Sequence, residues 1–509
     1  MLQQLDLTKN MSKEDYKKRM EVLEPELARL QRTCKAEKIP VIIVFEGFGA
    51  AGKGYQIGRL IHSLDPRGFY VNSIGPESTE EMMHPFLWRF WTKLPAKDQM
   101  AIFDRSWYRK VMIDRFDGIT SEKRLVTYYN EINSFERQLA ADGNVIIKLF
   151  LCIDKKEQKK RFKKLMEVRS SSWRVSEDDL KRNKNFDVYK EMSDEMLEYT
   201  DTAYAPWTIV EAMDREFATV KIYTAVIEAL KAAIRRKAEG SASDTNVSHV
   251  PVPASEYDDE VLRTSSLKKV DLSLSLERDE YKKELKELQR RIEELHGELY
   301  RRRIPMILGF EGWDAGGKGG AIKRLTDRMD PRGYIVHPTA SPNDIEKVHH
   351  YLWRFWNHVP KDGHIAIFDR TWYGRVMVER IEGFCTREEW QRAYQEINEM
   401  EKQFAEHGAI VLKFWMQIDK DEQERRFKER MENPDKQWKI TDEDWRNREK
   451  WDEYEKAVDE MLVRTSTTYA PWIIVEGNNK YYARVKVLRS VVNAMEERLG
   501  TAGKAKKQD

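Results

Sequence analysis

The sequence predicts the α/β fold class: two tandem domains, each with a central parallel sheet between two layers of helices and a helical lid. Three observations predict it. The chain repeats itself at an offset of 265 residues, the distance from position 53 to position 318, without a gap from near Asp6/Asp271 to Glu211/Glu476. Short apolar runs alternate with helical segments in both copies. A glycine-rich turn follows the first apolar run of each copy.

The repeat and its junction set the predicted domain boundaries. We predict a first domain over 1–238, a linker over 239–265, a second domain over 266–500 and a polar tail over 501–509. The segment from Gly240 to Ser255 is small, polar and punctuated by proline, which is typical of a linker. Each domain is long enough to bury a core of its own.

Charge balance and apolar content exclude several classes of protein. With Lys+Arg 89 against Asp+Glu 87 there is no chain-wide basic field, so we expect neither nucleic acid nor a membrane as partner. No apolar run reaches membrane-spanning length, and the first residues lack the apolar core of an export signal. Three widely separated cysteines, Cys34, Cys152 and Cys385, fit buried thiols in a reduced, cytoplasmic protein.

Each copy opens with an amphipathic helix of heptad spacing. Its apolar positions are Tyr281, Leu285, Leu288, Ile292, Leu295 and Leu299 in the second copy and Tyr16, Met20, Leu23, Leu27 and Leu30 in the first. Such a stripe more often packs on its own domain than on a partner, so we favour that interpretation and leave a homo-oligomer open.

Four apolar runs in each copy are predicted strands. They are 41–45, 101–103, 145–153 and 209–210 in the first copy and 306–310, 365–368, 410–418 and 473–475 in the second. Runs without alternation indicate strands covered on both faces. The helices between them indicate right-handed crossovers in a parallel sheet.

The turn after the first strand has the pattern of a phosphate-binding loop, or P-loop. It reads EGFGAAGKG from Glu46 in the first copy and EGWDAGGKGG from Glu311 in the second. Glycines let successive N–H groups face phosphate, the next helix adds positive potential, and the lysine reaches the outer phosphates. An accidental glycine-rich turn is the alternative, but the strand before and the helix after each loop argue against it.

The second loop departs from the usual form in a way that indicates a metal. Its last position is Gly319 rather than Ser or Thr, so no hydroxyl is available for Mg²⁺. Asp314 lies inside the loop instead, and a carboxylate facing phosphate is repelled unless a cation lies between them. We therefore predict that Asp314 is a metal ligand. An aspartate that only shapes the turn is the alternative.

A second carboxylate and two arginines follow the strand 365–368. Asp369 ends that strand, at the place of a Walker-B acid. Arg370 and Arg375 flank the next turn, where guanidinium groups can neutralise a transferring phosphoryl group. In the alternative, Asp369 and Arg370 pair only with protein groups. We disfavour it because the carboxyl ends of such strands bind ligands.

A charged stretch from Glu422 to Thr441 is the predicted lid. Its basic residues can close over a polyanion. A solvated helix face is the alternative interpretation of the same charges.

Together these motifs resemble the polyphosphate kinase 2 family. The matching segments are 311–320, 368–375, 378–380, 426–430, 438–439 and 467–472, with Lys480 and Arg484; the likeness extends through 270–498 and, eroded, through 5–235. The resemblance implies a metal-dependent transfer of phosphoryl groups between inorganic polyphosphate and nucleotides, without a covalent enzyme intermediate. Double-length members imply AMP as acceptor and ADP as product, with Mg²⁺, or alternatively Mn²⁺, as cofactor.

Carried over position by position, the resemblance assigns roles in the second copy. It implies that Asp314 and Asp369 hold the metal and that the catalytic set also includes Lys318, Arg370, Arg375 and Arg430. The implied phosphate- or nucleotide-binding positions are Gly312, Ala315, Gly316, Gly317, Gly319, Gly320, Glu379, Arg380, Lys439, Lys480 and Arg484. Gly374 stands where many family members have Asn.

The first copy departs from the second at the residues that chemistry would use. The replacements are Gly49 for Asp314, Tyr55 for Gly320, Lys110 for Arg375, Leu165 for Arg430 and Thr219 for Arg484. It keeps Lys53, Asp104 and Arg105. Losing a metal carboxylate, the lid arginine and a bidentate guanidinium would remove most transition-state stabilisation. We therefore expect a folded but weak or inactive first domain.

Two other functions stay open. An ATP-dependent nucleoside or nucleotide kinase of related fold would usually keep Ser or Thr where this chain has Gly319. A non-catalytic polyanion-binding scaffold suits the first copy but not the intact second copy.

Overall fold

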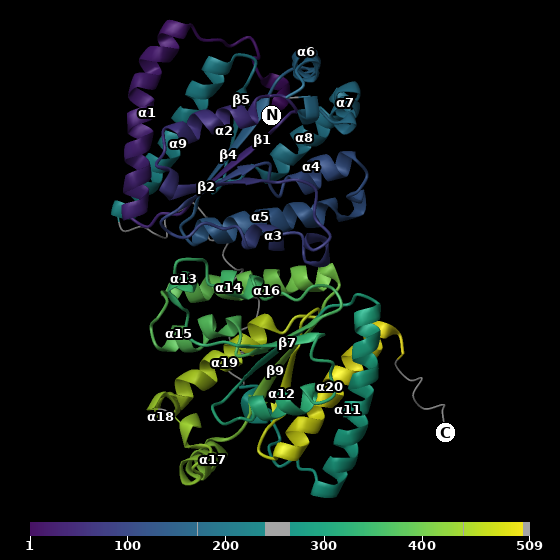
Figure 1. Cartoon of the computed structure of the whole chain (residues 1–509). Helices are drawn as coiled ribbons and strands as arrows, with labels where there is room; N and C mark the ends of the chain where they lie inside the picture. The colour runs from purple at the N-terminus through teal and green to yellow at the C-terminus, as the bar shows by residue number, and fades with distance from the viewer. Residues whose placement is uncertain (171, 240–264, 441, 502–509) are drawn as a thin grey trace. The chain divides into compact units, whose positions relative to one another are not determined.

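The computed structural model describes residues 1–170, 172–239, 265–440 and 442–501 (Figure 1). The chain divides into two compact units. These follow the two repeats, except that Ser78–Trp88 belongs to the second unit and Asn343–His350 to the first. The predicted linker, 239–265, and the predicted tail, 501–509, lie almost wholly outside the described residues. The domain boundaries therefore stay predictions.

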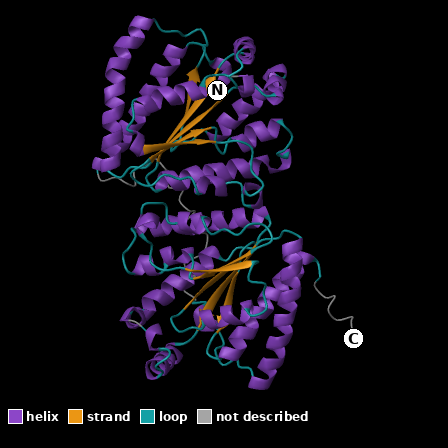
Figure 2. Cartoon of the chain, viewed as in Figure 1, coloured by secondary structure: helices purple, strands orange, loops and turns teal. Residues whose placement is uncertain are grey.

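Each unit is built on a five-stranded parallel sheet with helices on both faces, shown in orange and purple in Figure 2. The first sheet has the order β2-β3-β1-β4-β5, with β1 Val41–Gly47, β2 Phe69–Ser73, β3 Met100–Asp104, β4 Val145–Cys152 and β5 Trp207–Glu211. The second has the order β10-β9-β6-β8-β7, with β6 Met306–Gly312, β7 Tyr334–Pro338, β8 Ile365–Asp369, β9 Ile410–Gln417 and β10 Trp472–Glu476. The predicted α/β class with a central parallel sheet is confirmed.

The sequence prediction missed one strand in each repeat, β2 and β7. Both lie at an edge of their sheet and are partly exposed, in contrast to β1 and β4, which are buried along their whole length. An edge strand covers less of the core, so it lacks the continuous apolar run that marks the central strands.

The helices of the first repeat alternate with its strands. They are α1 Lys13–Ala36, α2 Lys53–His62, α3 Trp88–Trp91, α4 Arg109–Phe116, α5 Leu125–Ala141, α6 Lys155–Glu167, α7 Glu177–Lys184, α8 Phe186–Thr200 and α9 Arg215–Ala238. The 3-10 turns are η1 Leu2–Gln4, η2 Pro66–Gly68, η3 Glu81–Met83, η4 Glu122–Arg124 and η5 Ser172–Arg174.

The second repeat follows the same plan. Its helices are α11 Arg278–Arg301, α12 Lys318–Thr326, α13 Asp344–Lys347, α14 Trp353–Trp356, α15 Val378–Ile381, α16 Arg387–His407, α17 Lys420–Glu432, α18 Asp442–Glu449, α19 Trp451–Thr465 and α20 Lys480–Leu499. The 3-10 turns are η6 Leu267–Lys269, η7 Trp372–Val376 and η8 Gln437–Lys439. The predicted lid, 422–441, thus contains most of the helix α17 and the turn η8; its last residue, Thr441, lies outside the described residues, and α18 follows it.

The heptad stripe of α11 packs on its own domain. Ile292, Leu295 and Leu299 lie in the core with residues of α20, and Leu285 and Leu288 pack against that core. α1 packs on α9 in the same way in the first repeat. The favoured interpretation of the stripe is confirmed, because its apolar surface is already used within the domain.

The start of the P-loop lies against the neighbouring strand. Gly312 has φ 144°, and a Cβ at this position would lie 2.6 Å from the carbonyl oxygen of Met416 on β9. A residue with a side chain would meet both a strained φ and a backbone clash. Gly319, one residue into α12, has no atom within 4 Å of the corresponding Cβ position.

These two glycines give a matched prediction for stability. Gly312→Ala should lower the free energy of unfolding of its domain by about 2 kcal/mol or more, because strain and clash add. Gly319→Ala should leave it unchanged or raise it by up to about 1 kcal/mol, since alanine favours a helix. Denaturant unfolding of both variants checks this, and equal effects would contradict it.

Candidate active site

The candidate active site of the second repeat lies where two neighbouring parallel strands end. β6 pairs with β8 in a register that places Phe310 beside Asp369, so the P-loop and the turn after β8 leave the sheet together. The N–H of Arg370 donates to the carbonyl of Phe310 at 3.0 Å, with Arg370 in the left-handed region at φ 64°. The fold thereby brings Asp369 and Arg370 beside the loop.

Three of the predicted catalytic residues meet at the loop. The Nζ of Lys318 donates to the carbonyl of Gly312 at 2.6 Å and so curls over the loop backbone. The Nη2 of Arg370 lies 3.3 Å from Oδ1 of Asp314. The side chain of Arg370 is 52% exposed, which leaves it accessible to a ligand.

Asp314 also contacts the predicted lid and the helix that follows it. The Nδ2 of Asn447, on α18, donates to Oδ2 of Asp314 at 3.1 Å. Gln423, on α17, donates to the backbone carbonyl of Asp314 at 3.1 Å. The predicted lid, through α17, and the helix that follows it, α18, therefore both contact the residue that the sequence predicts as a metal ligand.

A buried arginine fastens α17 to the P-loop. Arg426 donates to the carbonyl of Ala315 at 2.8 Å and to that of Gly477, after β10, at 2.6 Å. Arg161 makes the corresponding contacts in the first repeat, to Ala50 at 3.2 Å and Ala212 at 2.9 Å. Arg426 can be buried because its N–H donors are satisfied by these backbone carbonyls and by the carboxylate of Glu422.

Arg430 and Lys480 lie in a crowded, charged environment near the loop. Burial lowers the pKa of Arg430, and the carboxylates of Asp444 and Asp314 oppose that shift. Burial also lowers the pKa of Lys480, whose Nζ lies 3.5 Å from Glu429. The side chain of Lys439 lies outside the described part of the structure.

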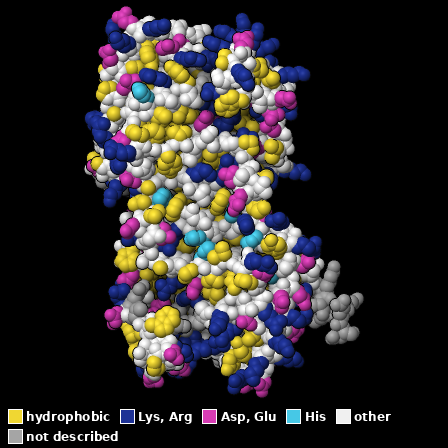
Figure 3. All heavy atoms as spheres, in the orientation of Figure 1, with side chains coloured by type: hydrophobic (Ala, Val, Ile, Leu, Met, Phe, Trp, Pro, Cys, Tyr) yellow, Lys and Arg dark blue, Asp and Glu magenta, His cyan; other side chains and the backbone are white. Residues whose placement is uncertain are grey.

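Arg484 faces the first turn of α12. A Cβ at Gly320 would lie 3.5 Å from its Nη2, so the glycine leaves room for the guanidinium beside the helix N-terminus. Figure 3 shows Lys and Arg side chains gathered over α12, between α17 and α20. A positive helix end surrounded by basic side chains favours an anion.

Arg375, Glu379 and Arg380 contact protein partners away from the loop. Arg375 lies 3.0 Å from Glu379 and over the ring of Tyr351 at 4.4 Å. Burial raises the pKa of Glu379, and Arg375 opposes that shift. Arg380 lies 2.6 Å from Glu460. The structure thus gives these three residues ion-pair partners rather than contacts with Asp314 or Lys318.

The carboxylates of the site suit a metal that takes part of its ligands from substrate. Among the described residues, no group of three or more His, Cys, Asp or Glu side chains is arranged to hold a metal ion. Mg²⁺ is commonly held by one or two carboxylates together with water and substrate phosphates. Asp314 and Asp369 provide that donor set.

Sequence reasoning missed the residue that joins the P-loop to the next turn. Glu311 accepts hydrogen bonds from the N–H of Thr371 at 2.6 Å and from its hydroxyl at 2.8 Å. Burial raises the pKa of Glu311, and Lys318 opposes that shift. The available signal was an acidic residue at the end of an apolar strand in both copies. Asn447 and Gln423 gave no comparable signal.

Side chains of α6 and α7 lie close to the P-loop of the first repeat. A Cβ at Gly49 would lie 3.0 Å from Cζ of Phe162 and 3.5 Å from Oδ1 of Asp179. Lys53 donates to the carbonyl of Gly47 at 3.0 Å, and burial lowers its pKa to about 8. A side chain at the position of Gly49 would therefore crowd Phe162 and lie beside the carboxylate of Asp179.

The replacements for Arg484 and Gly320, which are Thr219 and Tyr55, also contact other side chains of the first repeat. Thr219 donates its hydroxyl to Gln56 at 2.9 Å, and Arg215 lies over the ring of Tyr55 at 5.1 Å. At the N-terminus of α2, these side chains therefore contact each other, and no arginine takes the place of Arg484.

Each P-loop contributes one ring to an aromatic pair. Trp313 stacks on Trp451 with centroids 3.6 Å apart and rings 7° from parallel. Phe48 and Phe186 take these places in the first repeat, 4.9 Å apart and tilted by 48°.

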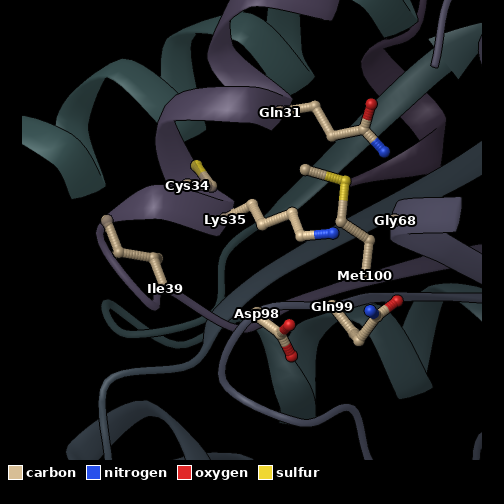
Figure 4. Close-up of a pocket in the computed structure, with 8 residues that line it drawn as sticks. All are labelled: Gln31, Cys34, Lys35, Ile39, Gly68, Asp98, Gln99 and Met100. Atoms are coloured by element: carbon tan, nitrogen blue, oxygen red, sulfur yellow. The ribbon is translucent and has the colours of Figure 1, made fainter. Parts of the chain in front are cut away.

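The small pocket in Figure 4 is a different place in the fold. Its lining includes Ile39, Asp98 and Met100, near the amino ends of β1 and β3, whereas the P-loops follow carboxyl ends. It is therefore not part of the candidate active site. Within the described ranges, no helix is long and apolar enough to cross a membrane.

Known proteins resemble the whole chain. The family model of polyphosphate kinase 2 matches residues 10–238 and again 275–502. A polyphosphate:AMP phosphotransferase of Pseudomonas aeruginosa is 40% identical over 497 residues, covering 97% of this chain and 99% of that protein. A polyphosphate:AMP phosphotransferase of Acinetobacter johnsonii is 33% identical over 94% of this chain and 95% of its own.

A solved structure agrees with the fold. A crystal structure from Pseudomonas aeruginosa, described as a polyphosphate kinase 2, superposes with a TM-score of 0.85 at 38% identity, covering 98% of this chain and 99% of that one. Because the family model matches each repeat and the relatives match end to end, this chain belongs to the polyphosphate kinase 2 family.

Proposed function

We propose that this chain transfers a phosphoryl group from inorganic polyphosphate to AMP, giving ADP, at the second repeat. Relatives that match nearly the full chain carry the name polyphosphate:AMP phosphotransferase. The observation that carries the assignment to the second repeat is the meeting of Lys318, Asp314 and Arg370 at the N-terminus of α12. The first repeat has Gly49 in place of Asp314, and a side chain there would crowd Phe162.

The proposed roles follow from charge and position. Backbone N–H groups from Gly312 to Gly320 and the N-terminus of α12 bind phosphate. Lys318 follows the transferring group, and Arg370, with Arg430 from the lid, neutralises its charge. Arg484 adds a cation beside Gly320. Arg375, Glu379 and Arg380 shape the turn from behind, which their ion pairs support.

A divalent metal is a general requirement of this family. We propose Mg²⁺ as the ion and Asp314 with Asp369 as its protein ligands. Bound there, it would neutralise charge on the phosphate oxygens. Because Asp314 already pairs with Arg370 and Asn447, those two side chains must rearrange when the carboxylate changes partner.

The function is tested with a matrix of donors and acceptors. Long-chain polyphosphate and ATP are each offered with AMP, GMP, ADP and GDP, and the products are separated by chromatography. We expect polyphosphate with AMP to give the highest kcat/KM. Turnover with ATP as the only donor would identify an ATP-dependent kinase, and binding without turnover would identify a scaffold; either outcome contradicts the proposal.

Asp314→Ala tests the metal site. It should lower kcat by about 10²-fold or more, the usual size of losing an electrostatic stabiliser. Asp327→Ala is the control, since it removes an exposed carboxylate from the other end of α12; it should keep parental turnover. Activity is measured with and without EDTA. Near-parental turnover of Asp314→Ala, insensitive to EDTA, would rule out this metal site.

Paired lysine variants test which repeat is active. Lys318→Ala should abolish transfer to AMP, because it removes the charge that follows the phosphoryl group. Lys53→Ala should leave kcat within a few-fold, about 1 kcal/mol or less in the barrier. Thermal unfolding of both variants first establishes that they fold. Equal inactivation by the two changes would mean that both loops take part in one turnover.

A further inference from the structure

Each repeat contains a buried ion pair next to the turn that follows the strand-end aspartate. In the second repeat, the Nζ of Lys413, on β9, lies 2.7 Å from Oε2 of Glu401, on α16, and their side chains are 1% and 0% exposed. The same Nζ donates to the hydroxyl of Tyr373 and to the carbonyl of Thr465, each at 2.7 Å. Four separate elements, β9, α16, η7 and α19, therefore meet at one ammonium group.

The carboxylate completes the network on the side of the turn. Oε1 of Glu401 accepts from the indole N–H of Trp372 at 3.0 Å and from the hydroxyl of Tyr373 at 2.8 Å. Tyr373 is 0% exposed, so its hydroxyl cannot reach a substrate. Any effect of this hydroxyl on turnover must pass through the protein.

The first repeat has the same network. Lys148 lies 2.8 Å from Glu136 and donates to the hydroxyl of Tyr108 at 2.9 Å. Glu136 accepts from the indole of Trp107 at 2.9 Å. The chain thus provides its own control, because the same buried network lies beside the loop with Asp314 in one repeat and beside the loop with Gly49 in the other.

The energetics of the pair favour a role in geometry. Burial lowers the pKa of Lys413 and raises the pKa of Glu401, and each partner opposes the shift of the other. Removing two charges from water costs most of what their attraction returns, so apolar residues would stabilise this place as well. The ion pair instead constrains geometry, because its hydrogen bonds fix the side-chain orientations of Trp372 and Tyr373 in the turn.

That turn carries Arg370. Tyr373 lies three positions after Arg370, and Arg370 has the uncommon φ of 64°. Thr371 is held by Glu311 on one side, and Trp372 with Tyr373 by Glu401 on the other. The backbone N–H of Arg370 is itself held by Phe310, so these contacts fix the backbone from which its guanidinium reaches Asp314.

We propose that Tyr373, held by Glu401 and Lys413, is a positioning residue that fixes Arg370 for phosphoryl transfer. The proposal rests on the proposed function of the second repeat. It predicts a loss of kcat from a residue that touches neither substrate nor metal.

The test compares Tyr373→Phe with its counterpart Tyr108→Phe. Each change removes one hydroxyl and keeps the ring and the ion pair. Both should lower the unfolding temperature of their domain to a similar extent, since each leaves Lys and Glu one partner short. Tyr373→Phe should lower kcat about tenfold with little change in the KM for AMP, and Tyr108→Phe should stay within twofold of the parent. Equal changes in kcat would overturn the proposal.

A double-mutant cycle separates positioning from general loosening. Tyr373→Phe is combined with Arg370→Ala, and the four kcat values are compared. If Tyr373 acts through Arg370, its removal should cost less than twofold once the guanidinium is gone. A tenfold loss in both backgrounds would mean that the hydroxyl acts elsewhere, and the proposal would be wrong.

The substrate preference of the unmutated enzyme separates a failure of this proposal from a failure of the proposed function. The cycle is run with whichever donor and acceptor the parent turns over. A different preferred pair would therefore contradict the proposed substrates while the ratios still test positioning. A parent that turns over no pair in the matrix would overturn both.

Discussion

The carboxylate of Glu311 joins the two segments on which the candidate active site depends. Glu311 is the second-last residue of β6, and its carboxylate accepts hydrogen bonds from the N–H and the hydroxyl of Thr371, in the turn after β8. A buried carboxylate without such donors would be costly, so this residue is satisfied only when loop and turn lie together. The first repeat repeats the contact, with Ser106 donating to Glu46 at 2.8 Å. The positions of Asp314, Lys318 and Arg370 all follow from this junction.

The sequence predicted the parts of the fold that rest on continuous burial. Central strands such as 41–45 and 306–310 lie between two helical layers and are therefore apolar throughout. A continuous apolar run of this length can be recognised from the sequence. The edge strands β2 and β7 were missed because partial exposure leaves them without that run. The loop lysine and the aspartates were predicted because they lie at fixed distances from glycines and strand ends.

The partners of those residues could not be predicted in the same way. Asn447 reaches Asp314 across 133 positions of sequence, and Gln423 reaches it across 109. Contacts of this kind depend on how α17 and α18 pack. Asparagine and glutamine are ordinary residues in a charged helix, so the sequence did not distinguish these two from their neighbours. The same holds for Lys413, a cation in the middle of an apolar strand, whose hydrogen-bond partners come from three other elements. Its presence in both copies was visible, but its role was not.

The stack of Trp313 on Trp451 has an optical consequence. Two indoles in van der Waals contact form a coupled chromophore, and this one begins one residue before Asp314. Any movement of the loop changes the separation or tilt of the pair, and with it the fluorescence and near-ultraviolet dichroism. Because phenylalanines occupy both places in the first repeat, this signal belongs to the second repeat alone. The molecule therefore carries a native spectroscopic reporter at the loop, without an added label.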